Sequence, residues 1–356
     1  MKGRCVGVPR EIKPLEGRVA LTPPVAAELV RAGHRVCLEQ GAGEISGYED
    51  AAYAAVGVEI LPDADSLYAS AEVVVKVKEP VGPELDRLRA EQILFSYLHL
   101  APNPALTRRL CEIGLTAIAF ETVMVDGDLP LLRPMSEIAG RIAVQVGTHL
   151  LHTPQGGRGV LLGGVPGVEH GQVAVLGAGH AGGSAARLAA ALGAQVTVFD
   201  RDPRKLAAMA ASAPNIQALY ASAEAIDRAV CTADLLVGAV LLPGAEAPRL
   251  VSRQQVAAMR DGSVIADIAV DQGGCIETTR PATYDDPVYV EEGVLHFCVT
   301  NMPGAVPRSA SQALAGALLP WLQRLLQPDW VDDPVLAGAI NVAEGEIVLS
   351  VLRGEE

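Results

Sequence analysis

Short apolar runs alternate along this chain with longer segments whose hydrophobic residues recur at helical spacing. Runs of this length predict buried β-strands, and the segments between them, such as Pro24–Ala32, predict helices. Strands that alternate with helices are typical of a parallel α/β sheet. The strands predicted in the first part of the chain are Cys5–Pro9, Arg35–Leu38, Glu72–Val77, Gln92–Leu98 and Leu115–Phe120.

The same alternation resumes later, which favours two domains because 356 residues are many for one hydrophobic core. A helical pattern from Ile138 to about His152 is predicted to connect them. Pro320 is expected to kink or divide a later helix, Ser309–Leu326. The amphipathic helical pattern of Val335–Leu352 is expected to return to the first domain. The later strands are predicted at Gln172–Leu176, Gln195–Phe199, Leu235–Leu242, Ser263–Val270 and Leu295–Val299.

A glycine-rich turn between two of these strands has the spacing of a dinucleotide-binding fingerprint. Gly177, Gly179 and Gly182 follow one strand and open an Ala-rich helix, and Asp200 ends the next strand. Backbone N–H groups at such a helix start favour a pyrophosphate. Asp200 would accept hydrogen bonds from the ribose and repel a 2′-phosphate, which favours NAD over NADP, although Arg201 could serve a phosphate. The alternative is a βαβ crossover without a ligand.

Composition excludes several classes of function. Half of the residues are hydrophobic but only 4% are aromatic, so the core is expected to be aliphatic. A net charge of −14 argues against nucleic acid as a partner. No apolar stretch is long enough to span a membrane and the N-terminus lacks signal-peptide features, which predicts a cytoplasmic protein. The six cysteines form no paired motif, so no metal site is predicted; Cys275 is of interest because it follows a candidate acid.

Polar residues follow the ends of several predicted strands in the first half of the chain, where parallel α/β sheets carry their chemistry. They are Arg18, Lys78, His99 and Glu121. Of the two lysines near the end of the predicted strand Glu72–Val77, Lys76 and Lys78, the position after the strand end favours Lys78 as the residue that faces a site.

Each candidate residue also has a structural interpretation. Arg18 and Lys78 could bind a carboxylate, or they could be a solvated turn residue and a surface lysine. His99 could transfer protons near neutral pH, or it could be a capping or core histidine. Asp271, predicted to follow the strand Ser263–Val270 directly, could activate water or stabilise a cationic imine; otherwise it forms a turn.

Ordered motifs over nearly the whole chain resemble one family, the NAD-dependent alanine dehydrogenases with the nucleotide-binding subunit of proton-translocating transhydrogenases. The resemblance implies two Rossmann-like domains with parallel sheets and a cleft between them. The substrate domain would be discontinuous, residues 1–134 plus 307–356, and the NAD-binding domain would be residues 135–306. The matching motifs are RVALTP (18–23), KVKEP (76–80), SYLHLA (96–101), ETV (121–123), LPLLRPMSEIAGR (129–141), GGRGVLLGGVPGV (156–168), LGAGHAG (176–182), DIAVDQGGC (267–275) and NMPGAVP (301–307).

The resemblance assigns roles where the motifs match. Arg18 and Lys78 would bind the substrate carboxylate, and His99 and Asp271 would form the acid/base pair. Ala221 stands where the family usually has serine, and Ser222 follows it. With the glycines of the fingerprint, the predicted NAD-binding residues are Ser136, Gly177, Gly179, His180, Ala181, Gly182, Asp200, Lys205, Ser222, Val240, Leu241, Ile268, Ala269, Val270, Asp271, Val299, Thr300, Asn301 and Met302.

The function that the resemblance implies is reversible oxidative deamination of L-alanine to pyruvate and ammonium, with hydride transfer from Cα to NAD. Two alternatives remain at this stage. The chain could be the NAD(H)-binding soluble subunit of a transhydrogenase, or a relative that acts on another small amino or imino acid. Family members are commonly homohexamers, so a homo-oligomer is expected.

Overall fold

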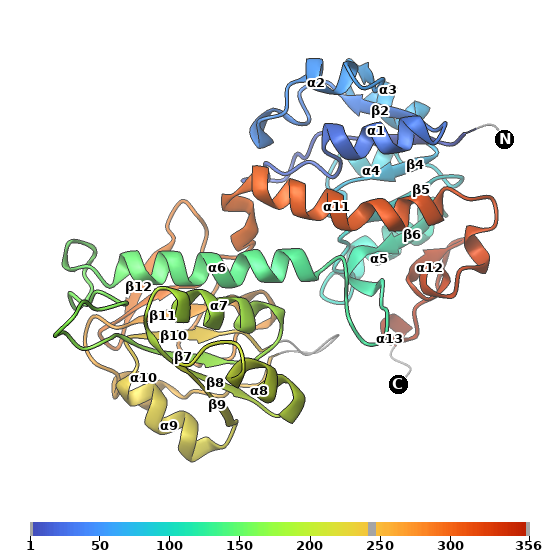
Figure 1. Cartoon of the computed structure of the whole chain (residues 1–356). Coiled ribbons are helices and arrows are strands. Elements are labelled where there is room, and N and C mark those ends of the chain that lie inside the picture. The colour runs from blue at the N-terminus through green and yellow to red at the C-terminus, as the bar shows by residue number, and fades with distance from the viewer. Residues whose placement is uncertain (1–2, 241–246, 354–356) are drawn as a thin grey trace. The chain divides into compact units, whose positions relative to one another are not determined.

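The computed structural model describes residues 3–240 and 247–353, and the chain divides into two compact units (Figure 1). One unit combines both ends of the chain, Met1–Met135 with Val306–Glu356, and the other is Ser136–Ala305. Helix α6 (Arg133–Leu150) leads the chain from the first unit into the second. Each unit contains one mostly parallel sheet, so the predicted α/β class is confirmed.

The sheet of the first unit has the strand order β15-β14-β6-β5-β4-β1-β2-β3. From β3 to β6 this is the doubly wound order 3-2-1-4-5-6, whose direction reverses between β1 and β4. In such sheets, ligands usually bind in the crevice beside the carboxyl ends of the strands at the switch point. The strands are β1 (Cys5–Val8), β2 (Arg35–Glu39), β3 (Glu59–Leu61), β4 (Val73–Val75), β5 (Ile93–Ser96), β6 (Thr116–Ala119), β14 (Ile340–Ala343) and β15 (Glu346–Ile347).

The second unit repeats this order with an antiparallel strand at its edge, β12-β13-β11-β10-β7-β8-β9. Its switch point lies between β7 and β10. Figure 1 shows α6 and α7 over one face of this sheet and α9 and α10 over the opposite face. The strands are β7 (Gln172–Leu176), β8 (Gln195–Asp200), β9 (Ile216–Tyr220), β10 (Leu235–Gly238), β11 (Val264–Asp267), β12 (Val288–Glu291) and β13 (Val294–Phe297).

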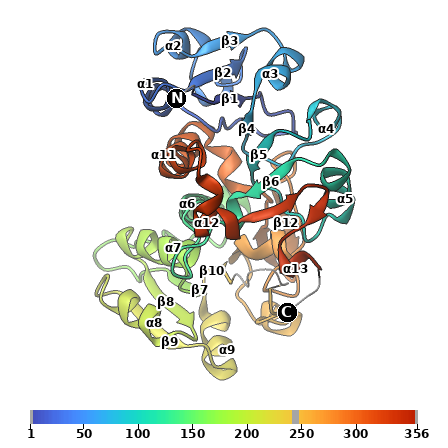
Figure 2. The ribbon, with the colours of Figure 1, turned by 90° about the vertical axis from the view of Figure 1, so that its right-hand side faces the viewer.

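Helices cover the sheets and bury an aliphatic core in each unit. In the first unit α11 lies beside α1 (Figure 1, Figure 2). The remaining helices of the first unit are α1 (Pro23–Arg31), α2 (Asp50–Ala54), α3 (Ala64–Ser70), α4 (Glu84–Arg87), α5 (Pro104–Ile113), α11 (Pro307–Leu325), α12 (Pro334–Gly338) and α13 (Ser350–Arg353). Those of the second unit are α7 (His180–Ala191), α8 (Pro203–Ala210), α9 (Ala223–Thr232) and α10 (Arg253–Ala257).

The C-terminal segment differs from the helix predicted for Val335–Leu352. It forms α12, the hairpin of β14 and β15, and α13. The hairpin turn uses left-handed backbone at Glu344 (φ 52°) and Gly345 (φ 83°), which ends any helix there. Strand β14 then pairs antiparallel with β6 and extends the first sheet. Division of the preceding helix was also wrong, because α11 continues through Pro320.

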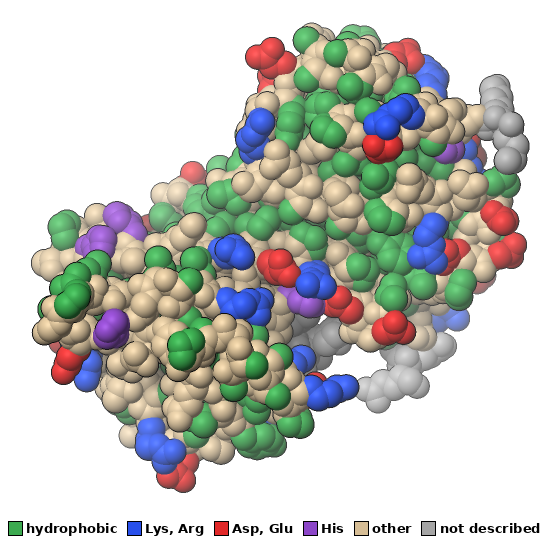
Figure 3. Space-filling view, viewed as in Figure 1, with side chains coloured by type: hydrophobic (Ala, Val, Ile, Leu, Met, Phe, Trp, Pro, Cys, Tyr) green, Lys and Arg blue, Asp and Glu red, His purple; other side chains and the backbone are tan. Residues whose placement is uncertain are grey.

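Charged side chains are dispersed over the face drawn in Figure 3, where basic and acidic groups alternate without one continuous basic patch. Within residues 3–240 and 247–353, no helix is long and apolar enough to cross a membrane.

Candidate functional site

Arg18 lies in the segment that follows β1, and it is buried instead of solvated. Only 3% of the residue is exposed. Its guanidinium forms a two-point ion pair with Glu16 and donates a third hydrogen bond from Nη1 to Met135 Sδ at 3.1 Å. Burial opposes the charge of Arg18, but the hydrogen bonds and the charge of Glu16 outweigh it and raise the pKa of Arg18. A permanently charged, oriented guanidinium is suited to bind a carboxylate.

Lys76 and Lys78 have different surroundings beyond the end of β4. The Lys76 ammonium is 1% exposed and lies 3.2 Å from Glu11 Oε2 and 3.1 Å from Glu84 Oε1. Because both carboxylates pair with its ammonium, Lys76 has a structural role. Lys78 forms no ion pair with any residue that the structure describes; burial, and then the nearby charge of Arg18, lowers the pKa of its ammonium. Lys78 is therefore the better candidate to receive an anion.

His99 follows β5 in an unusual backbone conformation. Its φ is 47°, in the left-handed region that few non-glycine residues adopt. The imidazole stacks over the ring of Tyr97 at a centroid distance of 6.0 Å, and about half of the side chain is exposed. Glu121, which follows β6, accepts a hydrogen bond from the His99 backbone N–H at 2.6 Å. An accessible imidazole on a held backbone is suited to proton transfer.

The glycine turn of the second unit has the geometry that its fingerprint requires. Gly177 has a φ of 99°, and a Cβ on Gly182 would lie 1.8 Å from Gly177 O, so a side chain is excluded at both positions. A Cβ on Gly179 would meet nothing within 4 Å, which leaves space beside the first turn of α7. Asp200 Oδ2 accepts from the Ala178 N–H at 2.8 Å and so ties the turn to the end of β8. His180 is the first residue of α7.

Asp271 does not directly follow a strand, which corrects the prediction. Strand β11 ends at Asp267, and Asp271 lies in the 3-10 segment Ile268–Gln272. Asp267 begins that segment by accepting from the Ala269 N–H at 3.0 Å, which removes the chain from the sheet early. Burial raises the pKa of Asp267. Cys275 donates to Asp267 Oδ1 at 3.7 Å and is fully buried, so this cysteine has a structural role beside Asp267.

The remaining predicted cofactor residues lie mostly on segments that follow strands of the second sheet. Val240 follows β10, and Ile268, Ala269 and Val270 follow β11. Ser136 lies on α6, and exposed Lys205 lies on α8. The Ser222 side chain caps α9 by accepting from the Ala225 N–H at 3.3 Å. Val299, Thr300, Asn301 and Met302 follow β13; Ala181 is in the first turn of α7; Leu241 lies outside the described residues.

The sequence did not reveal the supporting role of three glutamates that hold the candidate residues. Glu16 orients Arg18, Glu121 holds His99, and Glu11 Oε1 accepts from the backbone N–H groups of Val77 at 2.6 Å and Lys78 at 3.4 Å. Glu121 was noticed only for its place after a strand. A carboxylate near a cation in sequence is too common a pattern to mark Glu16 or Glu11.

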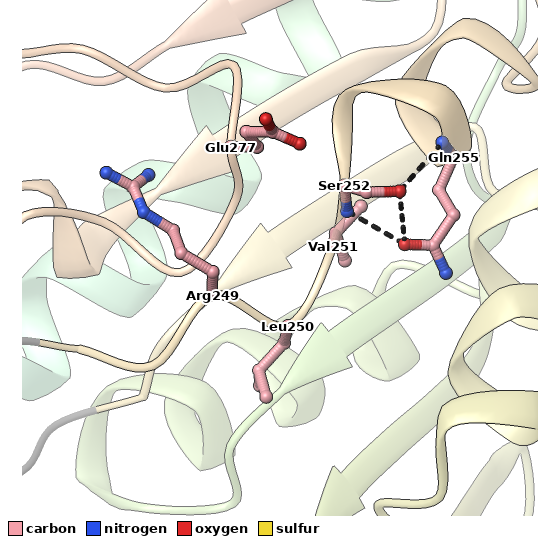
Figure 4. A pocket seen from close by; sticks show the side chains of 6 residues that line it. All are labelled: Arg249, Leu250, Val251, Ser252, Gln255 and Glu277. Carbon is pink, nitrogen blue, oxygen red and sulfur yellow. Dashed lines mark hydrogen bonds between the residues drawn. The ribbon is translucent and has the colours of Figure 1, made fainter.

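A surface pocket of about 610 Å³ lies in the second unit, and none of the predicted cofactor residues lines it (Figure 4). Its polar groups are engaged within the protein. Arg249 Nη1 donates to Ile276 O at 2.7 Å, and Ser252 and Gln255 cap each other at the start of α10. Its lining residues are Arg249, Leu250, Val251, Ser252, Gln255 and Glu277. Among the residues described, no cluster of side chains could hold a metal ion.

Comparisons with known proteins match the chain over nearly its full length. Residues 7–139 match the family model "Alanine dehydrogenase/PNT, N-terminal domain", and residues 143–350 match "Alanine dehydrogenase/PNT, C-terminal domain". An alanine dehydrogenase of Mycobacterium tuberculosis is 49% identical over 349 residues, which are 96% of this chain and 94% of that protein.

Solved structures give the same result. A structure of L-alanine dehydrogenase matches with a TM-score of 0.95 at 47% identity, covering 98% of both chains. A transhydrogenase structure from Sinorhizobium meliloti matches with a TM-score of 0.85 at 26% identity, covering 97% of this chain and 99% of that one. The two-unit fold is therefore shared by proteins with both kinds of name.

Proposed function

The chain belongs to the alanine dehydrogenase/PNT family, and we propose that it catalyses the reversible, NAD-dependent oxidative deamination of L-alanine to pyruvate and ammonium. The observation that carries this proposal is the pair of neighbouring cations, buried Arg18 and partly buried Lys78, in a chain 49% identical to a named alanine dehydrogenase. Two neighbouring cations can bind the carboxylate of a small amino acid, and the burial of Arg18 strengthens that attraction.

The glycine turn of the second unit fits a dinucleotide. The open space at Gly179 allows backbone N–H groups to approach a pyrophosphate, and Asp200 lies where a ribose would be bound. The carboxylate of Asp200 disfavours a 2′-phosphate, which supports NAD as the cofactor. The chemistry that NAD⁺ supplies when bound is acceptance of a hydride from the substrate Cα. Residues 135–306 would form the NAD-binding domain.

The roles of the polar residues follow from the reaction. Arg18 and Lys78 hold the carboxylate, which directs Cα of alanine toward the hydride acceptor. Loss of hydride leaves an iminium on the substrate, and a water molecule adds to that carbon. Asp271 or His99 accepts a proton from this water, and the same groups return protons as the carbinolamine releases ammonium. Residues 1–134 with 307–356 would form the substrate domain.

A second reading, a transhydrogenase subunit that binds NAD(H) without oxidising an amino acid, has the support of the shared fold. The presence of Arg18, Lys78, His99 and Asp271 disfavours it, because hydride exchange between nucleotides needs no ligand for an amino-acid carboxylate.

By resemblance to its family we also propose that the chain assembles as a homo-oligomer, a hexamer, in the cytoplasm. Light scattering on the purified protein tests the assembly.

The test of the activity is NADH formation by purified protein supplied with L-alanine and NAD⁺. D-alanine, NADP⁺ and a panel of small L-amino acids serve as controls. Turnover with L-alanine above the others supports the assignment. Turnover with a different amino acid alone overturns the substrate, and NADH binding without any amino-acid oxidation favours the transhydrogenase reading. His99→Ala should lower turnover to a small residual rate and leave NADH binding intact.

A further inference from the structure

The backbone of His99 is held in a conformation that its own residue type disfavours. A non-glycine residue at a φ of 47° carries a conformational cost of about 1 kcal/mol or more, and such residues persist only where their surroundings hold them. This conformation occurs three residues after the end of β5, and about half of the His99 side chain is exposed. A group that holds the backbone of His99 in this conformation therefore also constrains the position of its imidazole.

The group that holds the turn is the carboxylate of Glu121. Its Oε1 accepts from the His99 N–H at 2.6 Å and from the Leu98 N–H at 3.1 Å, and its Oε2 lies 3.3 Å from the Leu98 nitrogen. Two consecutive backbone donors thus converge on one carboxylate. The same Oε1 lies 3.9 Å from His99 Nδ1. One side chain therefore contacts both the backbone of His99 and the edge of its ring.

Glu121 is itself braced by the C-terminal part of the chain. It lies in the 3-10 turn Phe120–Thr122, where Phe120 is fully buried against the ring of Tyr97. Thr122 Oγ1 donates to Ala339 O at 2.9 Å and accepts from Asn341 Nδ2 at 2.9 Å. Strand β14, which contains Asn341, pairs with β6 directly before this turn. Residues from the C-terminal part of the sequence thus fix the backbone of the turn that carries Glu121.

From this arrangement we infer that Glu121 is a positioning residue for His99, which sets the direction of the imidazole during proton transfer. The inference rests on the proposed function, in which His99 transfers protons. Misplacement of a catalytic group by about 1 Å can lower a rate about 100-fold. Loss of the carboxylate releases the left-handed turn, so the imidazole samples other directions while Arg18 and Lys78 are unaffected.

The variants that test this are Glu121→Gln, Glu121→Ala, His99→Ala and the double variant Glu121→Ala/His99→Ala. The Gln carbonyl oxygen can still accept from both N–H groups, so Glu121→Gln should keep most of the turnover. Glu121→Ala should lower kcat about 10- to 100-fold, with KM for alanine and Kd for NADH within about threefold of the wild type. Glu112→Ala, an exposed glutamate of α5 in the same unit, is the matched control and should behave as the wild type.

The double variant separates positioning from a general loss of stability. A residue that acts through His99 costs nothing further once the imidazole is absent, so the double variant should match His99→Ala in kcat. Hydrogen exchange of the Leu98 and His99 amides gives a readout that needs no turnover: it should be faster in Glu121→Ala and near wild type in Glu121→Gln. If the alanine variant fails to fold, Glu121→Met replaces it.

Three outcomes would overturn the inference. The first is wild-type kcat in Glu121→Ala while His99→Ala keeps only a small residual rate, and the second is a double variant in which the two losses multiply. The third is unchanged exchange of the two amides in every Glu121 variant. Full turnover by His99→Ala is a different failure, because it removes the role of His99 from the proposed function itself and with it the role of Glu121.

Discussion

Glu16 and Arg18 form a buried two-point ion pair, in which Arg18 Nε lies 2.6 Å from Glu16 Oε1 and Arg18 Nη2 lies 2.5 Å from Glu16 Oε2. The two side chains are 1% and 2% exposed. The Arg18 backbone N–H also donates to Glu16 Oε1 at 3.0 Å. Two parallel bonds fix the plane of the guanidinium as well as its position. The direction in which Arg18 faces is therefore set by Glu16 and not by solvent.

Arg18→Lys should raise KM for alanine about tenfold or more with little change in NADH affinity. A lysine keeps the charge but cannot form two parallel bonds with Glu16, so the ammonium is not directed as the guanidinium is. Arg18→Met should lower the free energy of unfolding by about 3 to 5 kcal/mol, because it leaves the buried Glu16 carboxylate without its partner. Steady-state kinetics and denaturant unfolding measure the two effects. An unchanged KM in Arg18→Lys would contradict the role assigned to Arg18.

Lys78→Met should abolish alanine binding without loss of stability at neutral pH. Burial, and then Arg18, lowers the pKa of Lys78 in the folded protein, so folding is penalised while the ammonium is charged. Below both pKa values the penalty is constant. Between the lowered folded pKa and the unfolded value near 10.5 the unfolded chain binds more protons, so wild-type stability gains from this group as pH rises.

Two pH measurements check this sign. The unfolding free energy of the wild type should gain on that of Lys78→Met as pH rises through the window, and the affinity of the wild type for alanine should fall over the same range as the ammonium is lost. Lys76 is the contrast, because Glu11 and Glu84 raise its pKa against the effect of burial. A Lys78→Met variant much less stable than the wild type at pH 7 would refute the account.

The fold could be predicted from the sequence wherever a local pattern decides the structure. Most parallel strands of both sheets follow from apolar runs separated by helices, although β3 (Glu59–Leu61) and β9 (Ile216–Tyr220) were not predicted. The glycine turn follows from its spacing together with the strands and the helix that flank it. The C-terminal hairpin was missed because Val335, Leu336 and Ile340 recur at helical spacing, whereas the pairing of β14 with β6 joins residues more than 200 positions apart. No local pattern contains that information.

The same limit applies to the candidate site. Arg18, Lys78 and His99 could be found because each follows a predicted strand. Their supports could not, since Glu121 reaches His99 across 22 positions and Glu11 reaches Val77 across 66. The sequence predicted Asp271 directly after a strand, whereas β11 already ends at Asp267. The side chain of Asp267 accepts from the Ala269 N–H and so ends the strand, which the apolar run does not reveal.

Gly182→Ala should lower the stability of the protein and Gly179→Ala should not, although the two glycines belong to one turn. At Gly182 an added Cβ would lie 1.8 Å from the carbonyl oxygen of Gly177, so the backbone must move, at a cost of about 1 to 3 kcal/mol. At Gly179 the backbone has a φ of −70° and an added Cβ meets nothing within 4 Å, so stability should change by less than about 0.5 kcal/mol.

Gly179→Ala should instead weaken cofactor binding. Its methyl group would occupy the space through which backbone N–H groups approach a pyrophosphate, so Kd for NADH should rise at least about tenfold in a protein of normal stability. Thermal unfolding and a fluorescence titration with NADH distinguish the two variants. Normal NADH affinity in Gly179→Ala would place the pyrophosphate elsewhere.

Asp200→Ala should weaken NADH binding and narrow the preference for NADH over NADPH. The Asp200 carboxylate accepts from the Ala178 N–H at 2.8 Å with one oxygen and from the Arg201 N–H at 2.7 Å with the other. It thus supports the glycine turn while presenting a negative charge at the end of β8. Its loss should raise Kd for NADH about tenfold, the worth of one or two hydrogen bonds. Kd for NADPH should rise less, because the repulsion of a 2′-phosphate is lost with the carboxylate. Asp200→Asn is the matched control, since it removes the charge but keeps an oxygen that can accept from Ala178. A ratio of the two Kd values that stays constant across both variants would show that Asp200 does not select the cofactor.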